Sequence, residues 1–200
     1  MEKGILIEPE TVALIVLDYQ QDFLASLSKP ARKSLDESMT ALASIATACS
    51  IPVVLSGLVS DAFTGQTWPR LQQLIPDHRT IDRSRINCWE DPNFTDVIRN
   101  LKKNRLLFAG LWTETGVSFG ALSALAHGYD VFLVTNAAAG MSVTSHETAI
   151  QRMVQAGVVP VTWCQLLFEW YRVLSGKDSN IGQSLITIAR QRGYLLPDEH

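Results

Sequence analysis

Residues 12–17 read VALIVL, six apolar side chains in a row, and Asp18 follows them directly. A short apolar run bounded by polar residues is typical of a strand buried on both faces of a parallel sheet. Runs of the same character occur at residues 52–56, 105–109, 131–135 and 158–162, and a further short strand is predicted near 80–82. Because helical stretches alternate with these runs, the sequence predicts an α/β domain built on a parallel sheet.

The stretches between the strands repeat apolar residues at helical spacing. Helices are predicted over 31–48, from Asp91-Pro92 onward, over 117–127, from Thr144 or Ser145 onward, over 165–174 and over 181–192. Glu147 lies three residues after Thr144, as in a capping box at the start of a helix. The segment 57–87 shows no long regular pattern, and long irregular segments in compact domains are usually functional.

Composition excludes several classes of partner. The chain has 200 residues, a formal charge of −3 and 46% hydrophobic residues, which predicts one domain spanning 1–200. It has no apolar stretch long enough for a membrane span, no basic face for nucleic acid and no apolar leader, so we expect a cytoplasmic protein with a small-molecule substrate. The three cysteines and four histidines are widely spaced, so we expect no metal and no cofactor.

Ligands of parallel sheets bind beyond the carboxyl ends of the strands, which makes Asp18 the first candidate. Burial at that edge raises the pKa of a carboxyl group, which suits a general acid or base. The alternative is an Asp that only caps a loop. Residues 110–117 (GLWTETGV) join a predicted strand to a helix, where backbone N–H groups can hold an oxyanion. Alternatively, this segment is an ordinary turn in which Gly116 provides conformational freedom.

Three side chains between residues 83 and 88 could also reach such a site. Arg83 and Arg85 are the cations most able to do so, although arginines in such positions are more often solvated or paired at the surface. Cys88 could be a nucleophile, but a lone cysteine beside a tryptophan is more often a small buried filler.

Six motifs together resemble the isochorismatase-like, or cysteine hydrolase, superfamily, and they are closest to its YcaC-like branch. They are ALIVLDYQQDF (13–23), PVVLSG (52–57), INCWEDPNF (86–94), LLFAGLWTETGV (106–117), ALAHGYDVFLVTNA (124–137) and MVQAGVVPVTW (153–163). The resemblance implies a three-layer αβα sandwich around a parallel sheet of about six strands. It also implies assembly into homo-oligomers.

Typical members of this superfamily use an Asp, a Lys and a Cys as a catalytic triad. Matching the motifs residue by residue places Asp18 at the Asp, Arg83 at the Lys and Gly116 at the Cys. The thiol is therefore absent. Isochorismatases within the superfamily resemble this chain in having glycine there, and they cleave an enol ether by proton transfer from the Asp and attack of water. The resemblance thus implies a hydrolase that uses Asp18 for acid–base catalysis of C–O or C–N cleavage.

The resemblance implies further parts of the site. A non-proline cis peptide is expected between Leu111 and Trp112, with the N–H groups of Trp112 and Gly116 aimed at one oxyanion position. The substrate pocket is expected to be formed by Gln20, Phe23, Trp89, Trp112, Thr113 and Thr115. Members that bind zinc carry an Asp and two His after the second strand. The corresponding residues 60–65 (SDAFTG) contain Asp61 but no His, so no metal is expected.

Three alternatives remain at this point. The chain could be a catalytically silent member that binds a small molecule or serves as an assembly subunit. Gly116 could have been introduced by engineering to remove a nucleophile. Finally, the thiol could have been relocated to Cys88, although nothing beside Cys88 in the sequence is placed to lower its pKa.

Overall fold

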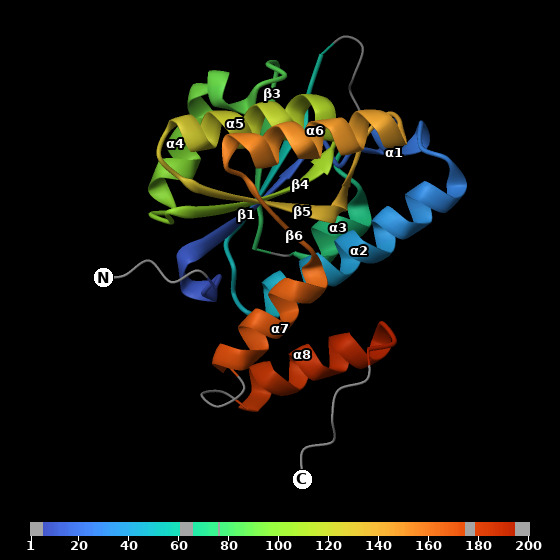
Figure 1. The fold of residues 1–200 in the computed structure, drawn as a ribbon, viewed down its shortest axis with the longest axis vertical. Helices are drawn as coiled ribbons and strands as arrows, with labels where there is room; N and C mark the ends of the chain where they lie inside the picture. The colour runs from blue at the N-terminus through green and yellow to red at the C-terminus, as the bar shows by residue number, and fades with distance from the viewer. Residues whose placement is uncertain (1–5, 61–65, 76, 175–178, 195–200) are drawn as a thin grey trace.

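The computed structural model describes residues 6–60, 66–75, 77–174 and 179–194. Its centre is a six-stranded parallel sheet with the strand order β3-β2-β1-β4-β5-β6 (Figure 1). The strands are β1 (Val12–Leu17), β2 (Val53–Leu58), β3 (Arg79–Arg83), β4 (Arg105–Leu111), β5 (Asp130–Ala139) and β6 (Val159–Val161). The α/β fold predicted from the apolar runs is thus confirmed.

Helices cover both faces of the sheet. They are α1 (Gln21–Ala25), α2 (Lys29–Ala48), α3 (Pro69–Leu74), α4 (Pro92–Asn100), α5 (Ser118–Ala126), α6 (Val143–Ala156), α7 (Trp163–Leu174) and α8 (Ser179–Gln191), with short helical turns η1 (Pro9–Thr11), η2 (Cys88–Glu90) and η3 (Thr113–Val117). Buried residues of α2, α3, α7 and α8 form one core cluster with the sheet, and those of α4, α5 and α6 form the other. Two cores separated by one sheet make a three-layer αβα sandwich.

The strand order fixes where a ligand can bind. From β1 the chain winds outward through β2 and β3, and it then returns to the other side of β1 to form β4. The crevice between the carboxyl ends of β1 and β4 is the switch point at which open α/β sheets bind ligands. Asp18 follows β1, and η3 lies just beyond β4. The topology therefore brings these two segments together.

Two strands approach each other very closely just before this crevice. Gly110 pairs with Leu17 in the ladder of β4 and β1 and has a φ of +119°. A Cβ atom at position 110 would lie 1.9 Å from the carbonyl oxygen of Leu17, so no other residue fits.

Some helix boundaries and loops differ from the prediction. The helix predicted to start at Thr144 or Ser145 begins at Val143, because the side chain of Ser142 accepts a hydrogen bond from the N–H of Ser145 and caps it. The prediction of a capping box formed by Thr144 and Glu147 was therefore wrong. The segment 57–87 is also more regular than predicted, since it contains α3 and all of β3.

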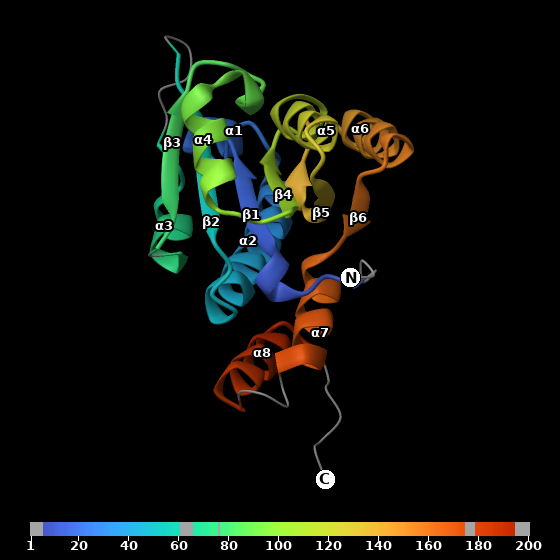
Figure 2. The ribbon, with the colours of Figure 1, turned by 90° about the vertical axis from the view of Figure 1, so that its left-hand side faces the viewer.

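The last two helices pack against each other and against α2. In both views α7 and α8 lie side by side below the sheet (Figures 1 and 2). The N-terminal segment is tied to α7, because the N–H of Ile7 donates to Glu169 Oε2 at 2.7 Å. Among the described residues, no helix combines the length and the apolar character needed to cross a membrane.

Candidate active site

Asp18 is held in a specific backbone conformation at the end of β1. Its φ is +53°, a left-handed value that Asp tolerates better than most residues. Its N–H donates to Ser56 O at 2.8 Å, and its carbonyl accepts from the N–H of Gln20 at 2.7 Å. The chain therefore turns sharply after the strand, and the residue stays only 5% exposed.

The partner of Asp18 is Arg83, the last residue of β3. Arg83 Nη1 donates to Asp18 Oδ1 at 2.6 Å and Nη2 donates to Oδ2 at 2.7 Å, which makes a bidentate ion pair. The same guanidinium also donates to the carbonyls of Ser56 and Ile86, at 3.5 and 3.3 Å. Arg83 is 2% exposed. The structure thus brings together two residues that lie 65 positions apart in the sequence.

Burial and pairing act on the Asp18 carboxyl in opposite directions. Burial raises the pKa of Asp18 above its ordinary value, while the hydrogen bonds and charge of Arg83 partly offset that rise. The pKa of Arg83 is lowered by burial but raised more by Asp18, so this guanidinium stays charged. The result is a desolvated carboxyl whose proton affinity is higher than that of a surface aspartate.

Gly116 lies directly against this ion pair. A Cβ atom at position 116 would lie 2.8 Å from Asp18 Oδ2 and 3.4 Å from Arg83 Nη2. The first distance is shorter than any normal carbon–oxygen contact, and the carboxylate cannot move freely because Arg83 holds both of its oxygens. Glycine at this position therefore lets the carboxylate pack against the η3 turn.

Two side-chain contacts fix the η3 turn from the side of α6. Glu114 Oε1 accepts from the N–H of Met141 at 2.8 Å, and Thr113 Oγ1 lies 2.8 Å from His146 Nδ1. Burial lowers the pKa of His146, which favours the neutral ring. The sequence analysis assigned no role to Glu114, Met141 or His146, because their contacts join segments that no motif links. The Leu111–Trp112 peptide bond before this turn is cis.

The predicted substrate-binding residues divide into two groups. Phe23 and Trp112 lie together, with ring centroids 6.0 Å apart and nearly perpendicular planes. Both line a cavity of about 400 Å³. Thr113 is buried and Thr115 is half-buried in the η3 turn itself.

Gln20 and Trp89 are placed differently. The Gln20 side chain is buried and bonded to the backbone of Leu58, donating to its carbonyl and accepting from its N–H, each at 3.0 Å. This contact joins α1 to the end of β2. Trp89 stacks on His127 with centroids 4.6 Å apart, beside the end of α5. The other ring contacts of Trp89 in the described structure are with Phe94 and Tyr129.

Cys49 and Cys88 are not placed as nucleophiles, and Cys164 lies on α7, away from the Asp18 site. Cys88 is fully buried in the core between the sheet and α5, and burial raises the pKa of its thiol to about 12. Burial likewise raises the pKa of Cys49 to about 12. Within the described ranges, no group of three His, Cys, Asp or Glu residues could hold a metal ion. Asp61, which the sequence analysis weighed for such a site, lies outside the described residues.

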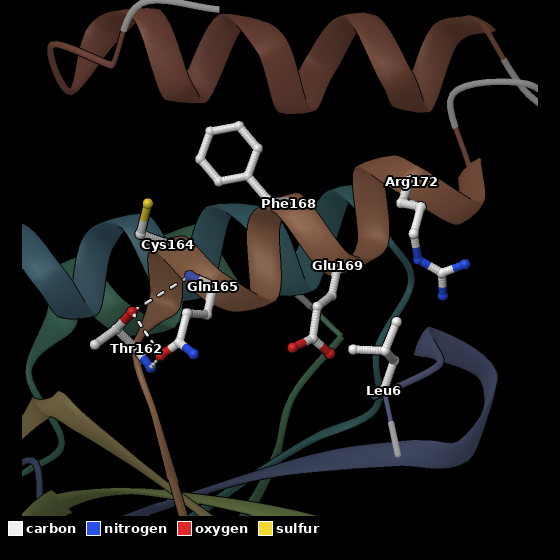
Figure 3. A pocket seen from close by; sticks show the side chains of 7 residues that line it. All are labelled: Leu6, Thr162, Cys164, Gln165, Phe168, Glu169 and Arg172. Atoms are coloured by element: carbon white, nitrogen blue, oxygen red, sulfur yellow. Dashed lines mark hydrogen bonds between the residues drawn. The ribbon is translucent and has the colours of Figure 1, made fainter. Parts of the chain in front are cut away.

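A second cavity of about 450 Å³ lies elsewhere, between the N-terminal segment and α7 (Figure 3). Its charged residues already have partners, because Glu169 accepts from Ile7 and Arg172 pairs with Glu8 at 2.9 Å. Figure 3 shows Glu169 projecting from α7 on the side of Leu6, whereas Phe168 projects toward α8. None of its lining residues belongs to the Asp18 site.

Comparison with known proteins assigns the family. The model of the isochorismatase domain matches residues 12–165, which include Asp18, Arg83 and the η3 turn. The chain belongs to the isochorismatase family. The probable hydrolase YcaC of Escherichia coli K12 is 29% identical over 175 residues, which cover 85% of this chain and 84% of that protein.

Two solved structures place this isochorismatase-family chain in the YcaC-like branch. YcaC from Pseudomonas aeruginosa, determined with hexane-2,5-diol and covalent acrylamide, superimposes with a TM-score of 0.83 at 26% identity and covers 96% of this chain and 98% of its own. The Escherichia coli YcaC structure, described as an octameric hydrolase of unknown specificity, gives the same score and identity over 96% and 97% of the two chains. The isochorismatase-like chain described here is accordingly a hydrolase.

Proposed function

We propose that this hydrolase cleaves a small organic substrate by proton transfer at Asp18 and attack of water, without a thiol nucleophile. The observation that carries the proposal is the bidentate Asp18–Arg83 pair packed against Gly116. This arrangement provides a buried proton-transfer group at the switch point of the sheet and leaves no side chain at position 116 to attack the substrate. The thiols of Cys49 and Cys88 have raised pKa values, which keeps them protonated.

An enol-ether substrate suits this arrangement. The Asp18 carboxyl donates its proton to the vinyl carbon, and the C–O carbon becomes an oxocarbenium ion. Water adds to that carbon, the hemiketal collapses, and a ketone and an alcohol leave while a proton returns to Asp18. Burial raises the pKa of Asp18, which is the direction that a proton donor requires.

Arg83 and the η3 backbone have supporting roles in this scheme. Arg83 holds the carboxylate that remains after proton donation, because its fork contacts both oxygens. We assign the N–H groups of Trp112 and Gly116 to the alcohol oxygen that leaves when the hemiketal collapses, because negative charge develops there. Phe23 and Trp112 form the walls of the substrate cavity. Thr113 holds the turn through its contact with His146, and Gln20 acts through the backbone of Leu58. Substrate binding by Thr115 and Trp89 stays a prediction.

Asp18→Asn is expected to reduce hydrolysis by at least about 10²-fold, since it removes general acid–base catalysis. The measurement is a screen of amides, esters and enol ethers with the full chain, followed by steady-state kinetics on any substrate found. Asp96→Asn is the matched control, because Asp96 is exposed and pairs with the exposed Arg99.

A second candidate function is that of a silent, ligand-binding family member. It is favoured by the mutual neutralisation of Asp18 and Arg83, which leaves the pair without free charge. Ligand binding without turnover in the screen would support it, whereas turnover that survives in Asp18→Asn would exclude it and would also contradict the role of Asp18. Hydrolysis that depends on Asp18 would exclude it.

The pH dependence of kcat separates an acid from a base. With Asp18 as proton donor, activity needs the protonated carboxyl and is expected to fall as pH rises through its raised pKa. A profile that instead rises with pH through an acidic limb would assign Asp18 as the base that activates water. Asp18→Asn should remove the limb in either case, which identifies the titrating group.

Assembly is proposed by analogy with the octameric relative. We propose that this chain also forms a homo-oligomer, which light scattering would measure directly. The cytoplasmic location and the assignment of residues 1–200 to one domain stay predictions.

A further inference from the structure

The cavity beside Trp112 has a composition that restricts what it can bind. It has a volume of about 400 Å³ and is lined by Asp22, Phe23, Ser26, Leu27, Trp112 and Met141. A cavity of this size is typical of small-molecule sites. Phe23 belongs to the helix that follows Asp18, and Trp112 directly precedes the turn that carries Gly116. The cavity is therefore built by the two segments that carry the proposed chemistry.

The two aromatic rings form a corner in this cavity. Their centroids are 6.0 Å apart and their planes meet at 82°. The face of an aromatic ring carries negative potential, which attracts an organic cation. Met141, which is 66% exposed, adds a flexible and polarizable side chain at the rim. Such walls accept an apolar group and favour one with a positive charge.

The charge in the cavity lining is negative, like the potential at the face of an aromatic ring. Asp22 is the only ionisable residue in the described lining, which contains no Lys, Arg or His. No ion pair or hydrogen bond to its side chain is found within the described ranges, and the residue is exposed. The nearby cation of the site, Arg83, is already paired with both oxygens of Asp18. A carboxylate ligand would find no counter-charge here, whereas an ammonium group would.

We propose that this cavity binds a small organic cation, so that the substrates of the enzyme carry an alkylammonium or quaternary ammonium group beside the bond that is cleaved. The identity of this substrate class rests on the proposed function, but binding of the cation does not require turnover. It can therefore be tested on the intact protein whether or not a substrate for hydrolysis is known.

The test compares three probes of nearly the same shape by isothermal titration calorimetry. Choline is the cation, 3,3-dimethylbutan-1-ol is its neutral isostere and 3,3-dimethylbutanoate is the anion. Choline is expected to bind at least about tenfold more tightly than the alcohol, which corresponds to a typical partly desolvated cation–π contact. The carboxylate is expected to bind most weakly. Equal affinity for choline and the alcohol, or tighter binding of the carboxylate, would overturn the proposal.

Variants locate the binding site. Asp22→Asn is expected to weaken choline binding about three- to tenfold and to change alcohol binding less than about twofold, because only the charge term is lost. Phe23→Leu should weaken choline binding more than alcohol binding. Asp96→Asn removes the same charge at a remote exposed site and should change neither. If Asp96→Asn weakened choline binding as much as Asp22→Asn, the selectivity would come from net charge and the assigned site would be wrong.

Asp18→Asn separates this inference from the proposed mechanism. The variant should keep the order of probe affinities while it loses hydrolysis. Loss of choline selectivity with intact Asp18-dependent hydrolysis would contradict the substrate class alone. Retained selectivity with no Asp18-dependent hydrolysis would contradict the mechanism alone.

Discussion

Replacing Arg83 by methionine is expected to lower the free energy of unfolding by about 3–5 kcal/mol, because a buried charge loses its partner. The guanidinium is inaccessible to solvent and the Asp18 side chain is only 7% exposed. Removal of Arg83 would leave a desolvated carboxylate with no cation. Urea denaturation at neutral pH and fixed protein concentration would measure the loss.

An exposed pair of the same chemistry provides the control. Arg99 Nη1 lies 3.1 Å from Asp96 Oδ1, and both side chains are more than half exposed, at 63% and 68%. Arg99→Met is expected to change the free energy of unfolding by no more than about 0.5 kcal/mol, because solvent screens such pairs. Similar losses in the two variants would mean that burial does not strengthen the Asp18–Arg83 pair.

The decrease in the free energy of unfolding caused by Arg83→Met should also change with pH in a predictable direction. Burial already raises the pKa of Asp18, and removal of the guanidinium raises it further. A carboxyl whose folded-state pKa lies above its unfolded value favours folding at low pH, and that contribution disappears as pH rises through the folded-state pKa. The destabilisation should therefore be largest at neutral pH and shrink toward acidic pH. The double variant Arg83→Met/Asp18→Leu should recover most of it.

The sequence predicted the sheet and the edge at which the site lies because apolar runs report burial on both faces. VALIVL matches β1 in both bounds, and the run at 105–109 lies within β4. Asp18 could be singled out from its position after such a run. Arg83 could be assigned only through the resemblance, since 65 residues separate it from Asp18. Periodicity contains no information about such a distant contact.

Other parts of the site depend on local geometry that the sequence does not determine. Ser142 and Thr144 both carry hydroxyl groups suited to an N-cap, and the capping-box pattern with Glu147 favoured the wrong one. Trp89 was placed in the pocket only through the resemblance, in which an aromatic residue follows the position of Arg83. Residues 87–89 instead lie along α5, where Asn87 bonds Ser123 at 3.1 Å and Trp89 stacks on His127. Ile86 stays at the site, since its carbonyl accepts from Arg83 Nη2 at 3.3 Å.

Gly116→Ala is expected to destabilise the fold by about 1–3 kcal/mol, because the added methyl group overpacks the site. Its Cβ would lie 2.8 Å from Asp18 Oδ2, and the bidentate contact with Arg83 prevents that oxygen from withdrawing. The cost should be smaller in an Arg83→Lys background, since an ammonium group holds the carboxylate less rigidly than the guanidinium fork. A double-mutant cycle on unfolding free energies measures this coupling, and additive effects would contradict it.

The same geometry predicts how a thiol at position 116 would react. In Gly116→Cys, the added Cβ crowds Asp18 Oδ2, whose negative charge raises the thiol pKa. The guanidinium 3.4 Å away offsets this only in part, because both carboxylate oxygens already engage it. In Gly116→Cys/Arg83→Lys, the carboxylate can turn away and a compact ammonium can approach the sulfur, which lowers the thiol pKa. The double variant is therefore expected to react with iodoacetamide at least about tenfold faster than Gly116→Cys at neutral pH, since about one pKa unit changes the thiolate fraction that much.

Wild-type protein provides the background from Cys49, Cys88 and Cys164, and free cysteine provides the reference rate. Equal alkylation rates in the single and double variants would mean that Arg83 does not hold the carboxylate in the space of the missing side chain, and that glycine at position 116 is not required by the ion pair.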